Sequence, residues 1–211
     1  MHAATKLSIF MCLIATSFAE HHRSCDSPNM TGILMVSDLR QSNTVGAYTY
    51  DSVANKLRFT SFSTDTFNSS LNLDVLFFFD EGIFYEIDGK NQSCEKKSLQ
   101  SSIHAMEIPS NAEFLSNMTI GSTTIEGEGI KISMWKGTVP GTKAQYMMGS
   151  SMGCLPLSFT CISETILIFS NTGIEMEIKD PDRLVVPSFC EAEVVEDTPE
   201  GKVNSFFSLF H

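Results

Sequence analysis

The residues with the clearest chemical spacing are Gly149-Ser150-Ser151-Met152-Gly153, which match the G-x-S-x-G pattern of serine esterases. In such an enzyme the serine is the nucleophile, and an acidic residue and then a histidine follow it in the chain. The only histidine after Ser151 is His211. The chain also lacks the alternating strands and helices that position such a triad. We therefore expect no catalytic triad and no enzymatic activity, and we interpret the segment as a loop that leads into Cys154.

Two turns of the chain offer oxygen ligands for a divalent cation. Asp80 and Glu81 form one acidic pair, and Asp180 and Asp182 form the other. The sequence has no EF-hand loop, so a calcium ion would have to collect its oxygen ligands from separate loops. In each pair the acidic residues are equally consistent with solvated turn residues.

Residues 1–19 have the composition of a secretory signal peptide. They contain one lysine, an apolar run over residues 7–15 and the ending Ser17-Phe18-Ala19. We expect cleavage before Glu20, which leaves a single secreted, extracellular domain over residues 20–211. No later stretch has the apolar length of a membrane-spanning helix, so we expect no transmembrane segment.

The chain is acidic, with a formal net charge of -11 at pH 7. Lys6 is the only charged residue of the predicted signal peptide, so its removal makes the net charge more negative by one. The phosphates of nucleic acid would repel such a protein, and we exclude nucleic acid as a partner. Divalent cations and basic partners are compatible with this charge, although acidity also serves solubility alone.

Five cysteines follow the predicted signal peptide, which itself contains Cys12. They are Cys25, Cys94, Cys154, Cys161 and Cys190. In a secreted protein they are expected to form disulfides, and no pair has the C-x-x-C spacing of a zinc site or a redox motif. Five choices of the unpaired cysteine and three pairings of the rest give fifteen arrangements with two bonds, all open at this point.

Secretion is also consistent with four Asn-x-Ser/Thr sequons, which are glycosylation sites in secreted proteins. They lie at Asn29, Asn68, Asn91 and Asn117. Each must be exposed if it carries a glycan, and we expect that at least one does.

A β-hairpin is predicted over residues 73–87. Two short apolar runs flank the turn Asp80-Glu81-Gly82, in which the glycine can take the left-handed backbone conformation. The first run is apolar on both faces, with Val75, Phe77 and Phe79 alternating with Leu76 and Phe78. Such a strand is either buried in the core on both faces or faces core on one side and an apolar ligand on the other.

Further short alternating runs indicate a mainly β protein made of antiparallel strands, as a sandwich, a barrel or a half-barrel. The runs are residues 31–40, 47–62, 130–135, 165–170 and 174–179, with turns at 51–55 and 171–173. Residues 111–115 are interpreted as a single helical turn. The tail over residues 198–210 places phenylalanines at helical spacing, which predicts an amphipathic helix packed on the sheet.

A set of short motifs extends through nearly all of the predicted mature chain. In chain order they are Cys25-x-x-Pro28, Glu81-Gly82, Tyr85-x-Ile87-Asp88, Cys94-x-Lys96-x-x-Leu99, Ile108-Pro109-x-x-Ala112, Ile120-Gly121, Trp135-x-Gly137, Cys154-x-Pro156, Asp180-Pro181 and Pro187-x-x-Cys190. No single motif is specific, but the ordered set resembles the ependymin-related family of secreted glycoproteins. Two departures are the segment Asn29-Met30-Thr31-Gly32, which lacks the family's usual tryptophan, and Cys161, which is extra.

This resemblance implies a fold similar to bacterial lipoprotein-carrier domains: a curved antiparallel sheet forming a half-open barrel or cup, with few short helices. It also implies a homodimer, calcium binding, contact with the extracellular matrix or a cell-surface partner, and lipid in the cup. It pairs Cys25 with Cys154 and Cys94 with Cys190. Cys161 is then left over, in an apolar run that favours a small buried core residue over a reactive thiol.

These observations predict a secreted, non-enzymatic, calcium-binding glycoprotein whose apolar cup holds a fatty acid or similar lipid. The alternative is a matrix or adhesion protein that acts through a calcium-loaded acidic surface and has no lipid ligand. The residues expected to line the cup are Val75, Phe77, Phe79, Phe84, Ile132, Met134, Ile174, Met176 and Ile178.

Overall fold

The computed structural model of the chain describes residues 25–39, 43–62, 72–199 and 202–210. The predicted signal peptide and Asn68 lie outside the described residues. The structure has an eleven-stranded antiparallel sheet. The strands are β1 (Met30–Asp38), β2 (Asn43–Asp51), β3 (Lys56–Ser61), β4 (Asp74–Phe78), β5 (Ile83–Asp88), β6 (Ser93–Ser98), β7 (Glu113–Gly121), β8 (Gly129–Thr138), β9 (Gln145–Ser151), β10 (Pro156–Ile162) and β11 (Ile166–Glu175).

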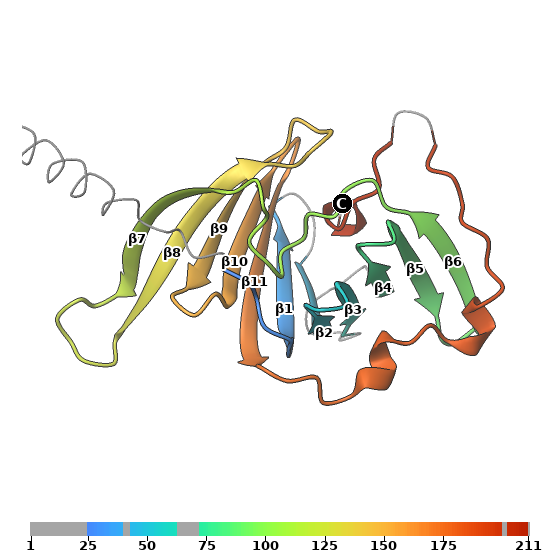
Figure 1. The fold of residues 1–211 in the computed structure, drawn as a ribbon, viewed down its shortest axis with the longest axis horizontal. Coiled ribbons are helices and arrows are strands. Elements are labelled where there is room, and N and C mark those ends of the chain that lie inside the picture. Colours follow the sequence, from blue (N-terminus) through green and yellow to red (C-terminus); the bar gives the residue numbers. More distant parts are fainter. Residues whose placement is uncertain (1–24, 40–42, 63–71, 200–201, 211) are drawn as a thin grey trace, which may run out of the picture.

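The sheet consists of two meanders that meet at its centre. Its strand order is β6-β5-β4-β3-β2-β1-β11-β10-β9-β8-β7, so β1 pairs with β11 and the edges are β6 and β7. After β6 the chain crosses the open side of the curved sheet to begin the second meander at β7 (Figure 1). The predicted mainly β, half-open architecture is confirmed, because the sheet curves without closing.

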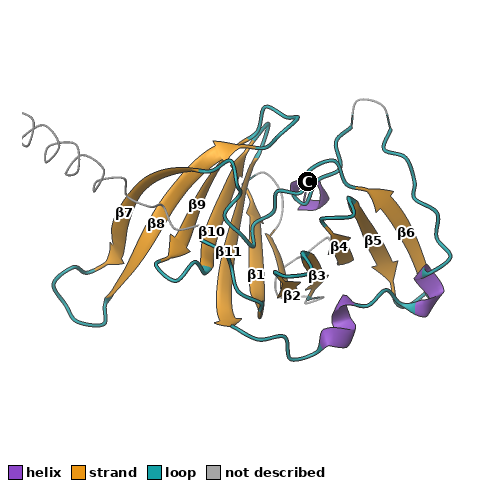
Figure 2. Cartoon of the chain, viewed as in Figure 1, coloured by secondary structure: helices purple, strands orange, loops and turns teal. Residues whose placement is uncertain are grey.

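The predicted hairpin is confirmed as β4 and β5, with Gly82 at a φ of +65° in the turn. The structure decides between the two interpretations of β4 in favour of core on both faces. Phe77 belongs to the large core cluster on the concave face, and Leu76 to a smaller cluster on the convex face. The convex cluster is covered by residues 178–190, which include the short 3-10 helices η3 (Pro181–Leu184) and η4 (Ser188–Cys190) (Figure 2).

The predicted strand over residues 174–179 is wrong beyond its second residue. β11 runs without interruption from Ile166 to Glu175, through the predicted turn at 171–173, and Gly173 takes a φ of +59° within it. The last β11 residue paired with β1 is Glu175, opposite Thr31 near the start of β1. Residues beyond Glu175 therefore have no neighbouring strand, and an alternating pattern alone cannot keep them in a sheet.

Two helical predictions are also wrong. Residues 111–115 are not a helical turn, because β7 begins at Glu113 and pairs with β8 along its length. The tail forms only the 3-10 helix η5 (Phe207–Phe210) instead of an amphipathic helix. Its phenylalanines are buried in the concave core cluster, so packing into that space decides the backbone conformation more than helical periodicity does.

Three glycines allow aromatic rings to lie against neighbouring strands on the concave face. A Cβ at Gly46 would lie 2.6 Å from the Phe59 ring, and one at Gly137 would lie 2.3 Å from the Tyr146 hydroxyl. Gly32 accommodates Tyr48 in the same way, at 2.9 Å from its hydroxyl. Such glycines allow close approach and strong local curvature, which a half-open sheet requires.

Both disulfides that the resemblance implies are present, Cys25–Cys154 and Cys94–Cys190. The first attaches the segment before β1 to the turn between β9 and β10, and the second attaches η4 to β6 on the convex face. Cys161 is free and buried, as expected, and burial raises the pKa of its thiol to about 11. Such a thiol is a core residue and not a reactive nucleophile at neutral pH.

Candidate functional site: the concave face and its internal cover

The concave face of the sheet carries the larger of the two apolar clusters in the described part of the chain. Its centre is aromatic: Phe77 stacks on Phe79 at a centroid distance of 5.2 Å and on Phe84 at 5.5 Å. Phe159 and Phe169 continue this surface across β10 and β11, edge to face at 6.3 Å. Alternation along each strand places these side chains on one face, so the sequence pattern determines that an apolar concave wall exists.

No second sheet covers this wall in the described part of the chain; two irregular segments do. The first is the crossing segment between β6 and β7, where Ile103, His104, Ala105 and Met106 are buried. The second is the C-terminal segment, which enters the space between the two meanders (Figure 1). The cup is therefore filled by the protein's own side chains.

Of the nine residues expected to line the cup, five lie in or against the concave cluster and four lie elsewhere. Val75, Phe77, Phe79 and Phe84 belong to the concave cluster, and Ile174 packs against its margin. Ile132 and Met134 lie on the opposite face of β8, because the alternate residue Trp135 pairs with Met148 of the concave cluster.

The remaining two residues are also outside the cup. Met176 is 69% exposed, beyond the end of β11, and Ile178 packs against the convex cluster. The expectation that Ile174, Met176 and Ile178 share one face with Phe77 is therefore wrong for the last two. It assumed that the strand continues beyond Glu175, where β11 ends.

The crossing segment carries a buried histidine that the sequence analysis did not identify. The His104 ring stacks on Phe79 at 3.9 Å and lies edge-on to Tyr50 at 5.3 Å. The Met106 backbone N–H donates to Nδ1 at 3.2 Å, so the neutral ring carries its proton on Nε2. Burial lowers the pKa of His104 to about 3, which keeps the ring neutral at physiological pH. No residue type or spacing in the sequence indicated this role.

Glu107 lies beside this histidine at the edge of the core. Its Oε1 is 3.7 Å from His104 Nε2, and its Oε2 accepts a hydrogen bond from the Tyr50 hydroxyl at 3.0 Å. Burial raises the pKa of Glu107, the Tyr50 hydrogen bond opposes this, and the negative charges of Asp80 and Asp26 raise it further. Asp80 and Asp26 therefore contribute to one negative region at this end of the sheet.

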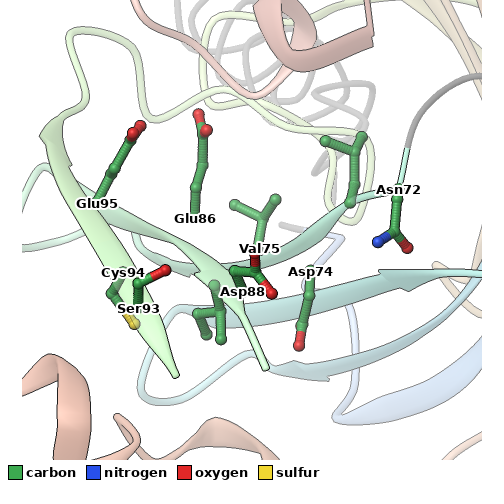
Figure 3. A pocket seen from close by; sticks show the side chains of 10 residues that line it. Asn72, Asp74, Val75, Glu86, Asp88, Ser93, Cys94 and Glu95 are labelled. Carbon is green, nitrogen blue, oxygen red and sulfur yellow. The ribbon is translucent and has the colours of Figure 1, made fainter. Parts of the chain in front are cut away.

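Two surface cavities are polar and do not resemble a lipid site. One of about 430 Å³ lies over β4, β5 and β6, and its acidic side chains are shown in Figure 3. Two of them, Glu86 and Glu95, form ion pairs with Lys97 at 3.0 and 2.6 Å. The other, of about 350 Å³, is lined by Arg58, Thr60, Asp180, Asp182 and Arg183.

The two acidic pairs expected to bind calcium differ in their surroundings. Asp180 and Asp182 share their cavity with two guanidinium groups, whose positive charge opposes a cation, so this pair does not fit calcium. Asp80 and Glu81 are exposed in the β4–β5 turn, and Asp80 Oδ1 accepts a hydrogen bond from Asn55 at 2.7 Å. Among the described residues, no group of three or more acidic, histidine or cysteine side chains is arranged to hold a metal ion.

Ser151 has a structural role in the β9–β10 turn. Its Oγ accepts hydrogen bonds from the backbone N–H groups of Gly153 at 3.2 Å and Leu155 at 3.1 Å. The segment predicted as a loop is in fact the end of β9 up to Ser151, followed by a tight turn in which Cys154 has a φ of +67°. An oxygen that holds two backbone donors stabilises this turn.

Three of the four sequons lie in described parts of the chain. Asn91 and Asn117 are exposed, in the β5–β6 turn and on β7. Asn29 is half-buried, and its Oδ1 accepts hydrogen bonds from the backbone N–H and the hydroxyl of Ser52 at 2.8 and 2.9 Å. Exposure therefore favours Asn91 and Asn117 over Asn29 as glycan carriers.

Comparisons with known proteins agree with this architecture. The family model described as Ependymin matches residues 67–190. Ependymin-1 of Oncorhynchus mykiss is 46% identical over 99% of this chain and 97% of that protein, and ependymin of Esox lucius is 44% identical with the same coverage.

More distant similarities extend over less sequence or over the fold alone. Mammalian ependymin-related protein 1 of Mus musculus is 24% identical over 61% of this chain and 58% of that protein. An uncharacterized conserved protein from Thermus thermophilus has a similar fold, with a TM-score of 0.52 at 8% identity over 88% of this chain and 99% of the other. The near full-length similarity to the fish proteins decides the assignment: this chain belongs to the ependymin family.

Proposed function

We propose that this protein is a secreted, non-enzymatic glycoprotein whose concave face binds a fatty acid or a similar apolar ligand. The observation that carries the proposal is an aromatic concave wall covered by irregular segments instead of a second sheet. Sites for apolar ligands are concave and lined mainly by hydrophobic and aromatic side chains. Segments outside the backbone hydrogen-bond ladder of the sheet can move to admit a ligand at lower cost than a strand can.

Secretion is supported by the N-terminal apolar run, the sequons and the disulfides. The apolar run in residues 7–15 and the four sequons are typical of secreted chains. The two disulfides suit an oxidising compartment. Among the described residues, no helix is long and apolar enough to cross a membrane.

The lipid proposal can be tested through Trp135, the chain's single tryptophan. Trp135 packs against the concave cluster, and its Nε1–H donates to Ser150 Oγ at 3.1 Å. A polyene fatty acid such as cis-parinaric acid entering the cup should accept energy from Trp135 and quench its emission saturably, with a stoichiometry near one. Mass spectrometry after gentle purification should also detect co-purified acyl chains.

A matched control separates the concave face from the convex one. Met118 of β7 is 46% exposed on the face opposite to Trp135, so Met118→Asp should leave the titration unchanged. Linear, non-saturable quenching, or loss of the quenching in Met118→Asp, would contradict a concave site.

A second candidate function is binding to the extracellular matrix or a cell-surface partner through an acidic, calcium-loaded surface. The negative region around Asp80, Glu107 and Asp26 favours it. We also propose that the protein forms the homodimer that the family resemblance implies.

Calcium is expected to act at the Asp80–Glu81 turn and to stabilise the fold by mass action. Affinities of extracellular calcium modules are about 0.1–1 mM, so millimolar calcium should add about 1 kcal/mol and raise the melting temperature by a few degrees. Thermal melts with and without calcium measure this shift. Asp80→Asn should reduce the shift and Asp182→Asn should preserve it, whereas a melt insensitive to millimolar calcium would exclude a useful site.

A further inference from the structure

We propose that residues 203–210 form a displaceable plug, the C-terminal plug, that occupies the ligand site until an apolar ligand replaces it. This inference rests on the lipid-binding function proposed above and assigns its regulation to a segment of the same chain. The plug would make the cup a binding site with a built-in competitor, so that free ligand must outcompete an intramolecular segment.

The plug occupies the centre of the concave space. Phe206 is fully buried and lies 5.5 Å from both Phe77 and Phe169, ring centroid to centroid. Phe207 stacks on Phe159 at 5.1 Å, and Phe210 lies edge-on to Phe59 at 5.6 Å. Three rings from one short segment therefore contact β3, β4, β10 and β11, the wall that an acyl chain would need.

The hydrogen bonds of residues 205–210 are internal to the plug. Ser205 and Ser208 bond to each other, through Ser205 N–H to Ser208 Oγ at 3.0 Å and Ser208 N–H to Ser205 Oγ at 3.2 Å. Among the described residues, no hydrogen bond joins residues 205–210 to a strand. Residues 205–210 are therefore held on the wall by apolar contacts, which are non-directional and which an alkyl chain can replace.

The plug is attached to the rest of the protein by hydrogen bonds of one residue, Asn204. The Asn204 N–H donates to Gln100 Oε1 at 2.6 Å, and the Gln100 N–H donates to the Asn204 carbonyl at 2.9 Å. Asn204 Nδ2 also donates to the Ser98 carbonyl at the end of β6 and to Thr198 Oγ1, both at 3.1 Å. Preceding it, Lys202 and Val203 are exposed. The plug is therefore anchored at Asn204, and the two described residues just before it are exposed.

The test cuts the covalent link between the plug and the rest of the chain and leaves the plug bound in the cup. A site-specific protease sequence is inserted between Lys202 and Val203, and the purified protein is cleaved so that the peptide of residues 203–211 stays bound non-covalently. A fluorescein-labelled synthetic peptide of the same residues exchanges into the complex, and its anisotropy is followed during titration with oleic acid. A peptide carrying Phe206→Ala, Phe207→Ala and Phe210→Ala is the matched control.

The expected result is that the labelled peptide binds, that oleic acid displaces it saturably, and that the control peptide does not bind. The cleaved protein freed of peptide should bind cis-parinaric acid at least about tenfold more tightly than the intact chain, since the intramolecular competitor is gone. In the intact protein, oleic acid should also speed amide hydrogen exchange in residues 205–210.

Three outcomes would overturn the inference. If both forms bind cis-parinaric acid with the same affinity, the plug does not compete, and the lipid-binding proposal stands without it. If oleic acid binds while the labelled peptide stays in place, the ligand uses another site. If neither form binds fatty acid, the plug and the lipid-binding proposal fail together.

Discussion

Replacing Cys25 and Cys154 by serine is expected to lower the free energy of unfolding by roughly 5 kcal/mol, according to the chain-entropy relation for a loop of 129 residues. This disulfide attaches the segment before β1, a central strand, to a turn in the second meander. Without it, that attachment depends on weaker contacts such as the hydrogen bond from Ser27 Oγ to the Cys154 carbonyl at 3.3 Å. The Cys94–Cys190 bond spans 96 residues and should have a similar effect.

Urea unfolding followed by circular dichroism measures both effects. The matched control is Cys161→Ala, which removes the free buried thiol and keeps both disulfides, and it should cost only about 1 kcal/mol as a small core truncation. Peptide mapping under non-reducing conditions should recover Cys161 as a thiol. Cys161 bonded to another cysteine of the same chain would refute the pairing, and a loss below about 1 kcal/mol for either serine pair would refute the structural role.

Acidification is expected to destabilise the fold through His104. Burial lowers its pKa from 6.5 to about 3, so the folded state binds fewer protons than the unfolded state in this range. The stabilising contribution of the neutral ring is fully present above pH 6.5 and is lost as pH falls from 6.5 toward 3. By pH 4 the loss amounts to about 3 kcal/mol, at about 1.4 kcal/mol per unit.

The charged neighbour of His104 partly opposes this effect. Because the pKa of Glu107 is raised in the fold, protonation of its carboxyl favours the folded state as pH falls. Tyr50 has a pKa raised by burial and stays neutral throughout this range. The remaining contacts of the ring, Phe79 and Phe206, do not titrate. His104 therefore dominates the loss of stability, and Glu107 reduces its slope.

The variant His104→Asn isolates this contribution. An asparagine Oδ1 can accept the Met106 N–H in place of Nδ1, and it does not titrate. Urea unfolding at pH 7, 6, 5 and 4 should give a steeper loss of stability for the natural protein than for the variant. Parallel curves would show that His104 does not titrate on unfolding in this range.

Several features of this fold were predictable because they depend on neighbours close in the sequence. The β4–β5 hairpin follows from two apolar runs around Gly82, and the turn at residues 51–55 follows from its polar residues. Both disulfides followed from resemblance to a family and not from spacing, which left fifteen arrangements open. The aromatic wall of the candidate site was predictable from Val75, Phe77 and Phe79, because alternation fixes which side chains share a face.

Other features required the tertiary structure. Residues 174–179 alternate as cleanly as any strand, yet the strand ends at Glu175 because its pairing with β1 ends there. Ile132 and Met134 have the chemistry of a pocket lining, but the register of β8 with β9 turns them away from the concave face. Register between strands is set by pairing and by packing on both faces of the sheet, and one strand's sequence does not contain it.

The sequence by itself therefore determined a mainly β chain with an apolar face and with the composition of a secreted protein. These properties depend only on composition and on residues that are close together in the chain. Only the tertiary structure decided what covers that face. The periodicity of Phe206, Phe207 and Phe210 predicted an amphipathic helix packed on the sheet, but these rings fill the cup from a segment that forms only the short 3-10 helix η5. Their burial depends on contacts with β3, β4, β10 and β11, which lie far away in the chain and come together only when the sheet curves.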